Sequence, residues 1–442
     1  LFAVPVFAEG DGNAQPAAAP INTQEALEQA LAAAAPAGGT VTLEGNITLK
    51  TPITVPANVT LDGAGAYTLT AGGGFNGSHV VLAIGNLSNV TVNADGKANY
   101  AVQAYGEGTN ATLTNVAMQN GMYSALLVNS GATVTATGCT FVTGSGFSAV
   151  ELTTGPDHSG PLPSFTIDDL PDSLTVRADV GSGPQPTVTV GDGEPIMTAT
   201  VKNSDQVWYV NNSAEMLTSL ASNGQFETIT LGGDIEYGGP VILNQPIHLN
   251  GNGHTFTLTR DISSDAVYGN ALTVTADGVS ISNLTVNANN NAKYGIHLCD
   301  VNDTVLDNVT VENGKYNGVL VNGATVTMKN MTFRNNGGKD VGGIELGKGT
   351  NVPNNPKVTL EGTINSDKLD KVLYVDVKQV GAANAAGAIE NKTSNLNITV
   401  GADGSVTVVD KNATPDPKPE EKPENPAPSA PAKANPKTGV KA

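Results

Sequence analysis

The chain of 442 residues contains an internal repeat. Residues 22–168 recur loosely as residues 212–361. Leu43, in GGTVTLEGNITL, matches Leu231, in FETITLGGDIEY, 188 positions further along the chain. A match that keeps its frame over about 140 residues indicates duplication rather than chance similarity of composition. The sequence therefore predicts two similar domains in tandem.

A shorter repeat inside each copy indicates the architecture. Polar–apolar tetrads such as NVTV recur 22 to 26 residues apart, beginning at Asn89, Asn115 and Gly138 in the first copy and at Asn283, Asn308 and Asn330 in the second. Their alternation predicts strands with one buried face. Short strands with a repeat in the low twenties favour the coils of a parallel β-helix over a sandwich, whose hairpins need not repeat. We expect the asparagines to form turns and to stack in ladders between coils rather than to contact a ligand.

A helical pattern opens each copy. Asn22-Thr23-Gln24-Glu25 precedes ALEQALAAAA, and Asn212-Ser213-Ala214-Glu215 precedes MLTSLAS, so each segment predicts an N-cap and a short amphipathic helix. Because a solenoid leaves open strand edges at its ends, we expect each helix to cap a first coil.

In this architecture the chain resembles the right-handed parallel β-helix proteins of the pectin-lyase-like superfamily, in which such a helix often precedes the first coil. The resemblance implies an all-β protein made of two tandem right-handed parallel β-helices. We expect the first over residues 21–209 and the second over residues 210–409, each with a short N-terminal capping helix.

Composition limits the partners. The net charge is −19, and the only arginines are Arg177, Arg260 and Arg334, which argues against nucleic acid or an anionic membrane surface as the main partner. A polyanionic ligand would need bridging cations. The cysteines, Cys139 and Cys299, occupy different places in the two copies, so we expect free thiols rather than a disulfide. No stretch predicts a membrane span.

The two ends of the sequence predict location. Residues 1–8, LFAVPVFA, resemble the tail of a secretory signal peptide, and residues 9–20 form a polar linker. A buried N-terminal strand is the alternative for residues 1–8. Residues 410–434 are rich in proline, lysine and glutamate, a composition typical of an extended stalk that spans a cell wall.

The pentad Asn435-Pro436-Lys437-Thr438-Gly439 follows this stalk at residues 435–439. It resembles the cell-wall sorting signals of Gram-positive bacteria, with Asn435 where that family usually has leucine. The resemblance implies that a sortase cuts between Thr438 and Gly439 and joins the threonine to peptidoglycan, in a form that extends beyond Ala442. We therefore expect a secreted protein of the Gram-positive cell wall. A tail that contains the pentad by chance is the alternative.

Residues that resemble an active site are sparse. The resemblance to β-helix lyases implies clustered carboxylates for calcium and a basic residue, but none of the three arginines has such neighbours in the sequence. Asp300 and Asp303, with His297 upstream, come closest to the set of a hydrolase. Turn formation is a sufficient explanation for the two aspartates, and His254 is typical of a turn or strand. We therefore predict no catalytic residue, no cofactor and no metal site, with calcium as an option that no clear site supports.

Paired tyrosines carry the binding hypothesis. Tyr100 aligns with Tyr294, and Tyr123 with Tyr316, and the two tyrosines of each copy are about one coil apart. Parallel strands lie about 4.8 Å apart, so the rings either stack over the edge of the core or present an aromatic strip to a sugar chain. Aligned glutamates, Glu151 and Glu345, are expected simply to face outward from their strands.

The sequence thus predicts a non-catalytic surface protein that serves adhesion or glycan binding. Its partner would be an extracellular glycan or a host or microbial surface, besides peptidoglycan. A polysaccharide lyase or glycoside hydrolase acting on plant or host glycans is the alternative, and a passive spacer is a third possibility.

Overall fold

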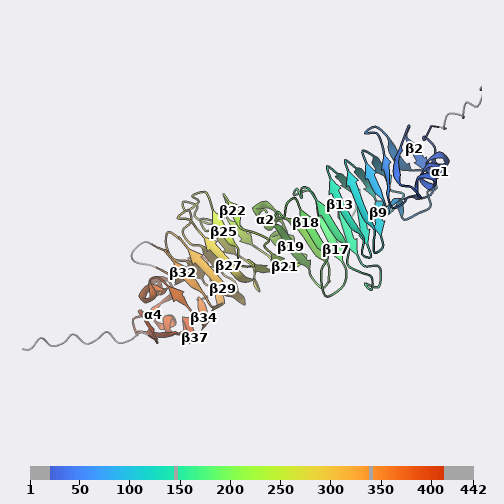
Figure 1. The fold of residues 1–442 in the computed structure, drawn as a ribbon. Helices are drawn as coiled ribbons and strands as arrows, with labels where there is room; N and C mark the ends of the chain where they lie inside the picture. The colour runs from blue at the N-terminus through green and yellow to red at the C-terminus, as the bar shows by residue number, and fades with distance from the viewer. Residues whose placement is uncertain (1–19, 144–147, 338–341, 413–442) are drawn as a thin grey trace, which may run out of the picture.

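The computed structural model describes residues 20–143, 148–337 and 342–412. They form an elongated solenoid of short strands that are mostly parallel (Figure 1). Strand twist favours a right-handed course for such connections. The fold confirms the predicted all-β parallel β-helix. Three predictions concern residues outside the described ones. They are the signal remnant within residues 1–19, the stalk at residues 413–434 and the sorting signal Asn435–Gly439.

Three parallel sheets build the first half, and each full coil supplies one strand to each sheet. The first sheet contains, in stacking order, β1 (Gly39–Thr42), β4 (Val59–Asp62), β7 (Asn86–Ser88), β10 (Asn110–Thr114), β13 (Thr133–Thr137), β16 (Ser164–Ile167) and β18 (Thr187–Val190). The second contains β2 (Ile47–Leu49), β5 (Thr68–Ala71), β8 (Thr91–Asn93), β11 (Ala117–Gly121) and β14 (Thr140–Thr143). The third contains β3 (Ile53–Val55), β6 (His79–Ala83), β9 (Tyr100–Tyr105), β12 (Ser124–Asn129), β15 (Val150–Thr153) and β17 (Val176–Asp179).

The second half repeats this plan. Its first sheet contains β21 (Phe226–Thr230), β24 (His248–Asn250), β27 (Ser280–Asn287), β29 (Thr304–Glu312), β31 (Thr325–Lys329), β34 (Lys357–Gly362) and β37 (Ile389–Thr393). β27 and β29 bend and continue into the second sheet, beside β22 (Ile235–Tyr237), β25 (Thr255–Leu258), β32 (Thr332–Arg334) and β35 (Asn365–Ser366). The third contains β23 (Val241–Leu243), β26 (Leu272–Val274), β28 (Ile296–Cys299), β30 (Val319–Asn322), β33 (Ile344–Gly347) and β36 (Leu373–Val375).

Antiparallel strands join the two halves, a feature that the sequence did not predict. β19 (Ile196–Val201) pairs with both β20 (Val207–Asn211) and β21, and β20 also pairs with β17. Buried apolar side chains form two clusters, and neighbouring residues of β20 contribute to different ones: Tyr209 to the first and Val210 to the second. Successive residues of a strand point to opposite faces, which explains this division. The halves are therefore connected by continuous backbone hydrogen bonds.

Helices lie where the sequence predicted them. The α1 helix (Gln24–Ala34) buries Leu27 and Leu31 in the first cluster, and the Thr23 hydroxyl accepts a hydrogen bond from the Ala26 amide at 3.2 Å. The α2 helix (Ala214–Asn223) follows Ser213, whose hydroxyl accepts from the Met216 amide at 3.1 Å. In the described part of the chain, no helix has the length and apolar character needed to cross a membrane.

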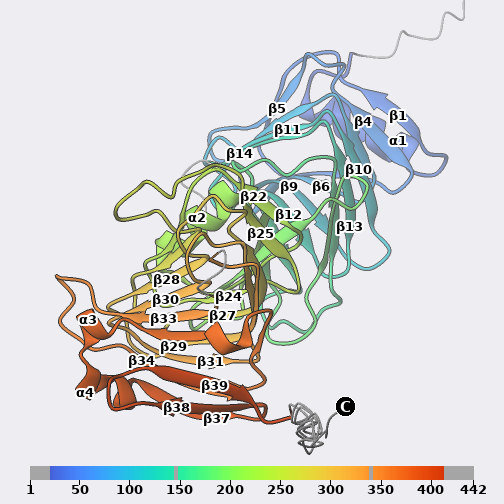
Figure 2. The same ribbon diagram turned by 90° about the vertical axis from the view of Figure 1, so that its left-hand side faces the viewer.

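The last coil is followed by elements that the repeat did not predict. An antiparallel hairpin lies beside β37 at the end of the solenoid, together with short helices (Figure 2). These elements are β38 (Leu396–Val400), β39 (Val406–Asp410), α3 (Val377–Val380), α4 (Ala382–Ala385) and the 3-10 helices η1 (Leu369–Lys371) and η2 (Ala386–Ala388).

Asparagine turns connect successive strands within a coil, as at Asn89 between β7 and β8, and the prediction of turn asparagines is confirmed. The predicted tetrad asparagines have positive φ, between 49° and 55°. Their side chains also form ladders. The Asn115 amide donates to Asn89 Oδ1 at 3.1 Å, and the Asn308 amide donates to Asn283 Oδ1 at 2.9 Å. Asparagine suits these positions because it tolerates left-handed angles and its amide both donates and accepts hydrogen bonds.

Replacing Asn308 with alanine should lower the free energy of unfolding of the second half by about 1–2 kcal/mol, because alanine loses the ladder bond and resists φ of +55°. Asn308→Gly, which accepts positive φ but also loses the bond, should cost less. Denaturation can be followed by fluorescence of Trp208, the only tryptophan, which packs against the second cluster. Equal free energies of unfolding for the two variants would contradict this, because they would show that the positive φ does not destabilise alanine here.

Candidate functional site

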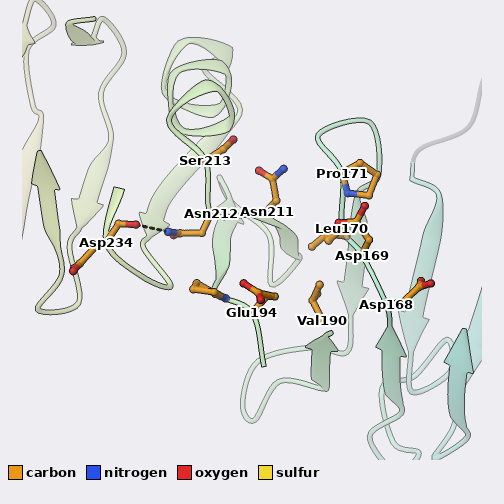
Figure 3. A pocket seen from close by; sticks show the side chains of 11 residues that line it. Asp168, Asp169, Leu170, Pro171, Val190, Glu194, Asn211, Asn212, Ser213 and Asp234 are labelled. Carbon is orange, nitrogen blue, oxygen red and sulfur yellow. Dashed lines mark hydrogen bonds between the residues drawn. The ribbon is translucent and has the colours of Figure 1, made fainter. Parts of the chain in front are cut away.

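A cleft of about 580 Å³ lies where the two halves meet, and carboxylates line it (Figure 3). Asp168 and Asp234 lie on opposite sides of it, well apart. Both serve the coils themselves, since Asp168 accepts from the Gly138 amide and Asp234 from the Thr255 amide, each at 2.8 Å. Across the described residues, no three His, Cys, Asp or Glu side chains gather as they would around a metal ion. The cleft is therefore acidic but shows no convergent site.

The third sheet of each half presents a more specific arrangement on the face that points away from the core. Strand register places equivalent side chains of successive coils in one column. The columns are Thr54, Leu82, Gln103, Leu127, Glu151 and Arg177 in the first half, and Ile242, Thr273, His297, Leu320, Glu345 and Tyr374 in the second. The two glutamates thus occupy the same position of the two repeats.

In the first half, the glutamate joins a tyrosine pair; we call Tyr100, Tyr123, Glu151 and Arg177 site 1. The Tyr100 hydroxyl donates to Glu151 Oε2 at 3.4 Å, and its ring meets that of Tyr123 edge to face with centroids 6.0 Å apart. Arg177 pairs with the same carboxylate oxygen at 3.1 Å, and both side chains of this ion pair are only 12% exposed. Tyr123 is 45% exposed and forms the outer wall of the site.

In the second half, the arrangement recurs; we call Tyr294, Tyr316, Asn317, Glu345 and Tyr374 site 2. The Tyr294 hydroxyl donates to Glu345 Oε2 at 2.9 Å, and the Tyr294 and Tyr316 rings meet edge to face with centroids 5.7 Å apart. The buried Asn317 amide also donates to Glu345 Oε2, at 3.0 Å. Tyr316 is 51% exposed, and Tyr374, one strand further on, is 47% exposed.

The inner tyrosines remain hydrogen-bond donors at neutral pH. Burial and then the negative charge of Glu345 raise the pKa of Tyr294 well above its usual value. Burial and Glu151 likewise raise the pKa of Tyr100, while the positive charge of Arg177 opposes them. Each phenol therefore keeps its proton and orients a carboxylate.

The repeat indicated which tyrosines lie next to each other but not the residues that they contact. Glu151 and Glu345 face outward as expected, yet each also accepts the hydroxyl proton of an inner tyrosine, Tyr100 or Tyr294. The spacing held the signal, because each glutamate follows its tyrosine by 51 residues in both copies. Nothing in the spacing identified Tyr374, whose strand follows a longer connection.

The residues closest to a hydrolase set do not converge. Asp300 and Asp303 are exposed, with φ of 50° and 55°, so both act as turn residues. Asp300 accepts a hydrogen bond from the Asn354 amide at 2.9 Å rather than from His297.

The other two arginines and both cysteines lie outside site 1 and site 2. Arg260 is exposed and donates to the Gly238 carbonyl at 2.6 Å, and Arg334 is exposed at the end of β32. His254 lies 3.5 Å from Asp234, beside a turn. Cys139 and Cys299 are half-buried free thiols, as predicted, and burial raises the pKa of both.

His297 lies between the side-chain amides of Asn322 and Asn270. Asn322 Oδ1 accepts from the Gly349 amide at 2.8 Å, so its Nδ2 faces His297 Nε2, at 3.4 Å. A neutral imidazole has one N–H, which must then be on Nδ1, beside the Asn270 amide at 3.2 Å. The buried Asn270 Oδ1 has no partner among the described residues, and turning that amide over would let it accept the Nδ1 proton. Burial, with a smaller effect of Lys293, lowers the pKa of His297 to about 4.

Comparisons with known proteins add little to this geometry. No protein-family model matches the chain, and no curated protein matches it. Among solved structures, the chain is similar to the A-module of the mannuronan C-5 epimerase AlgE4 of Azotobacter vinelandii. The two are 11% identical, the match covers 84% of this chain and 90% of that chain, and the TM-score is 0.23. At this identity and TM-score, the similarity says nothing about activity.

His297 should make the second half sensitive to acid. Its folded-state pKa lies below the ordinary value of 6.5, so the unfolded chain binds the extra proton, and stability should fall as the pH drops from 6.5 towards 4. His297→Gln places here the residue that the first column has as Gln103. It should reduce the loss of unfolding free energy between pH 7 and pH 4.5 by about 2 kcal/mol. Unfolding free energies at the two pH values test this, and equal losses in both proteins would contradict it.

Proposed function

We propose that the chain is a glycan-binding protein of the bacterial cell surface and that site 1 and site 2 hold the sugar. The observation that supports this most strongly is the recurrence of the same tyrosine, tyrosine and glutamate contacts in both halves. Core packing does not require an outward-facing carboxylate bonded to a phenol, because burying or half-burying a charge costs free energy.

The arrangement suits a sugar chemically. Exposed rings such as Tyr123 and Tyr316 offer an apolar surface to the C–H face of a pyranose, while a carboxylate accepts hydrogen bonds from its hydroxyl groups. The inner tyrosines fix the carboxylates before any ligand arrives. Such preorganisation reduces the entropy lost on binding.

Two sites on one chain favour long glycans. The halves are joined by hydrogen-bonded strands, so the distance between the sites varies little. A polymer that reaches both sites binds the second at a raised effective concentration, which strengthens overall attachment. Adhesion to a glycan-coated surface is therefore the role that we propose.

Location at the cell wall is part of the same proposal. It is supported by the signal-like residues 1–8 and by the sorting-like pentad Asn435–Gly439 at the end of the proline-rich segment. A secreted, wall-linked protein would present its solenoid to glycans outside the cell, and a sortase would supply the link to peptidoglycan.

Tyr123→Ala and Tyr316→Ala should each weaken binding on a glycan array at least about ten-fold, because each change removes an exposed aromatic surface. Tyr268→Ala is the matched control, since Tyr268 is 42% exposed but belongs to neither site. Equal losses in all three variants, or none, would contradict the assignment of the two sites.

Cleavage is tested separately. Incubation with polygalacturonate and other uronates, with and without calcium, should give no rise in the absorbance of unsaturated products. A rise would instead support the polysaccharide lyase alternative.

A further inference from the structure

The two sites differ in charge. In site 1 the negative charge of Glu151 is balanced by Arg177, at 3.1 Å. At the equivalent register position, site 2 has Tyr374 in place of the arginine. Within the described residues Glu345 forms no ion pair, and its partners are the neutral Tyr294 hydroxyl and Asn317 amide.

The protein bonds to Glu345 occupy one oxygen and leave the other for a ligand. Both donors bind Oε2, and Oε1 accepts no hydrogen bond from a described residue. Glu345 Oε1 is not buried, so water reaches it. A donor that arrives from solvent would therefore meet an accessible carboxylate oxygen.

Nearby lysines are engaged elsewhere. Lys315, next to Tyr316, pairs with Asp261 at 2.7 Å, and Lys293 donates to the Asp265 carbonyl at 2.6 Å. Negative charges raise the pKa of the neighbouring tyrosine. Besides burial, Asp376 and then Glu345 raise the pKa of Tyr374. Neither lysine forms an ion pair with Glu345, so among the described residues this carboxylate has no direct counter-ion.

Exposed rings flank that charge. Tyr316 is in edge-to-face contact with Tyr294, which bonds to Glu345, and Tyr374 lies on the adjacent strand, about 4.8 Å away in a parallel sheet. Aromatic faces attract ammonium groups through their quadrupole, and a nearby carboxylate adds a charge-assisted hydrogen bond.

We propose that site 2 selects glycans that carry free, protonated amino groups, such as deacetylated hexosamine chains, whereas site 1 accepts neutral sugars. This rests on the proposed glycan-binding function and assigns a ligand class to one of its sites. In site 1, Arg177 already occupies the place that the ligand ammonium takes in site 2.

The test compares two oligosaccharides of equal length, β-1,4-linked glucosamine and its fully N-acetylated form, by calorimetry with the full chain at mildly acidic pH and low salt. We expect the amino form to bind at least about ten-fold more tightly, and this preference to shrink at high salt. Glu345→Gln should abolish the preference, and so should Tyr374→Arg, which copies the ion pair of site 1. Glu236→Gln is the control, because it removes one exposed carboxylate of β22 outside both sites. A thermal unfolding curve for each variant serves as the check that it is folded.

The outcomes separate the two proposals. Equal affinity for both oligosaccharides, weakened but not abolished in Tyr316→Ala because site 1 is unchanged, would leave the glycan-binding function intact and overturn the selectivity of site 2. A preference that survives Glu345→Gln and Tyr374→Arg would overturn it as well. Absence of binding to any glycan would instead remove the proposed function. Competition by free lysine or a lysine-rich peptide as effective as the oligosaccharide would show recognition of ammonium alone and count against a glycan ligand.

Discussion

The structure depends on the backbone pairing of each coil with the next, and the left-handed turns make that pairing possible. A coil closes only where the chain reverses curvature sharply, and asparagine does this at modest cost. The amides then bond along the solenoid, as Asn308 does to Asn283 at 2.9 Å, so one residue type sets both the turn and the alignment of neighbouring coils. The columns of outward side chains follow from this alignment, since a shift of one residue would turn every strand over.

A fixed register explains how two halves with diverged sequences keep the same site. Tyr100 and Glu151 meet because the coils place them in contact, and Tyr294 and Glu345 meet for the same reason. Substitutions on the outward face then change chemistry without disturbing the core. Asn317 stands where the first copy has Ser124, and it gives Glu345 a donor that Glu151 lacks.

Periodic features could be predicted from the sequence, whereas features at the ends of a repeat could not. Coil length, turn asparagines and the helices after Thr23 and Ser213 are all local patterns, and the structure confirms them. The antiparallel strands β19 and β20 belong to no repeat, so no periodicity indicated their direction. Contacts across coils, such as Arg177 with Glu151, required the register itself, because sequence separation alone does not place two outward side chains together.

The energetics of the two glutamates support a difference in ligand class. At site 1 both charges are largely removed from water, and their desolvation is offset by a close ion pair. At site 2 the same desolvation would be costly without a cation, so the carboxylate keeps one oxygen towards solvent and takes neutral donors on the other. An incoming ammonium would replace that water and gain the attraction that Arg177 supplies in the first half. A neutral sugar has no comparable gain to offer, so selectivity follows from the missing countercharge rather than from the shape of the site.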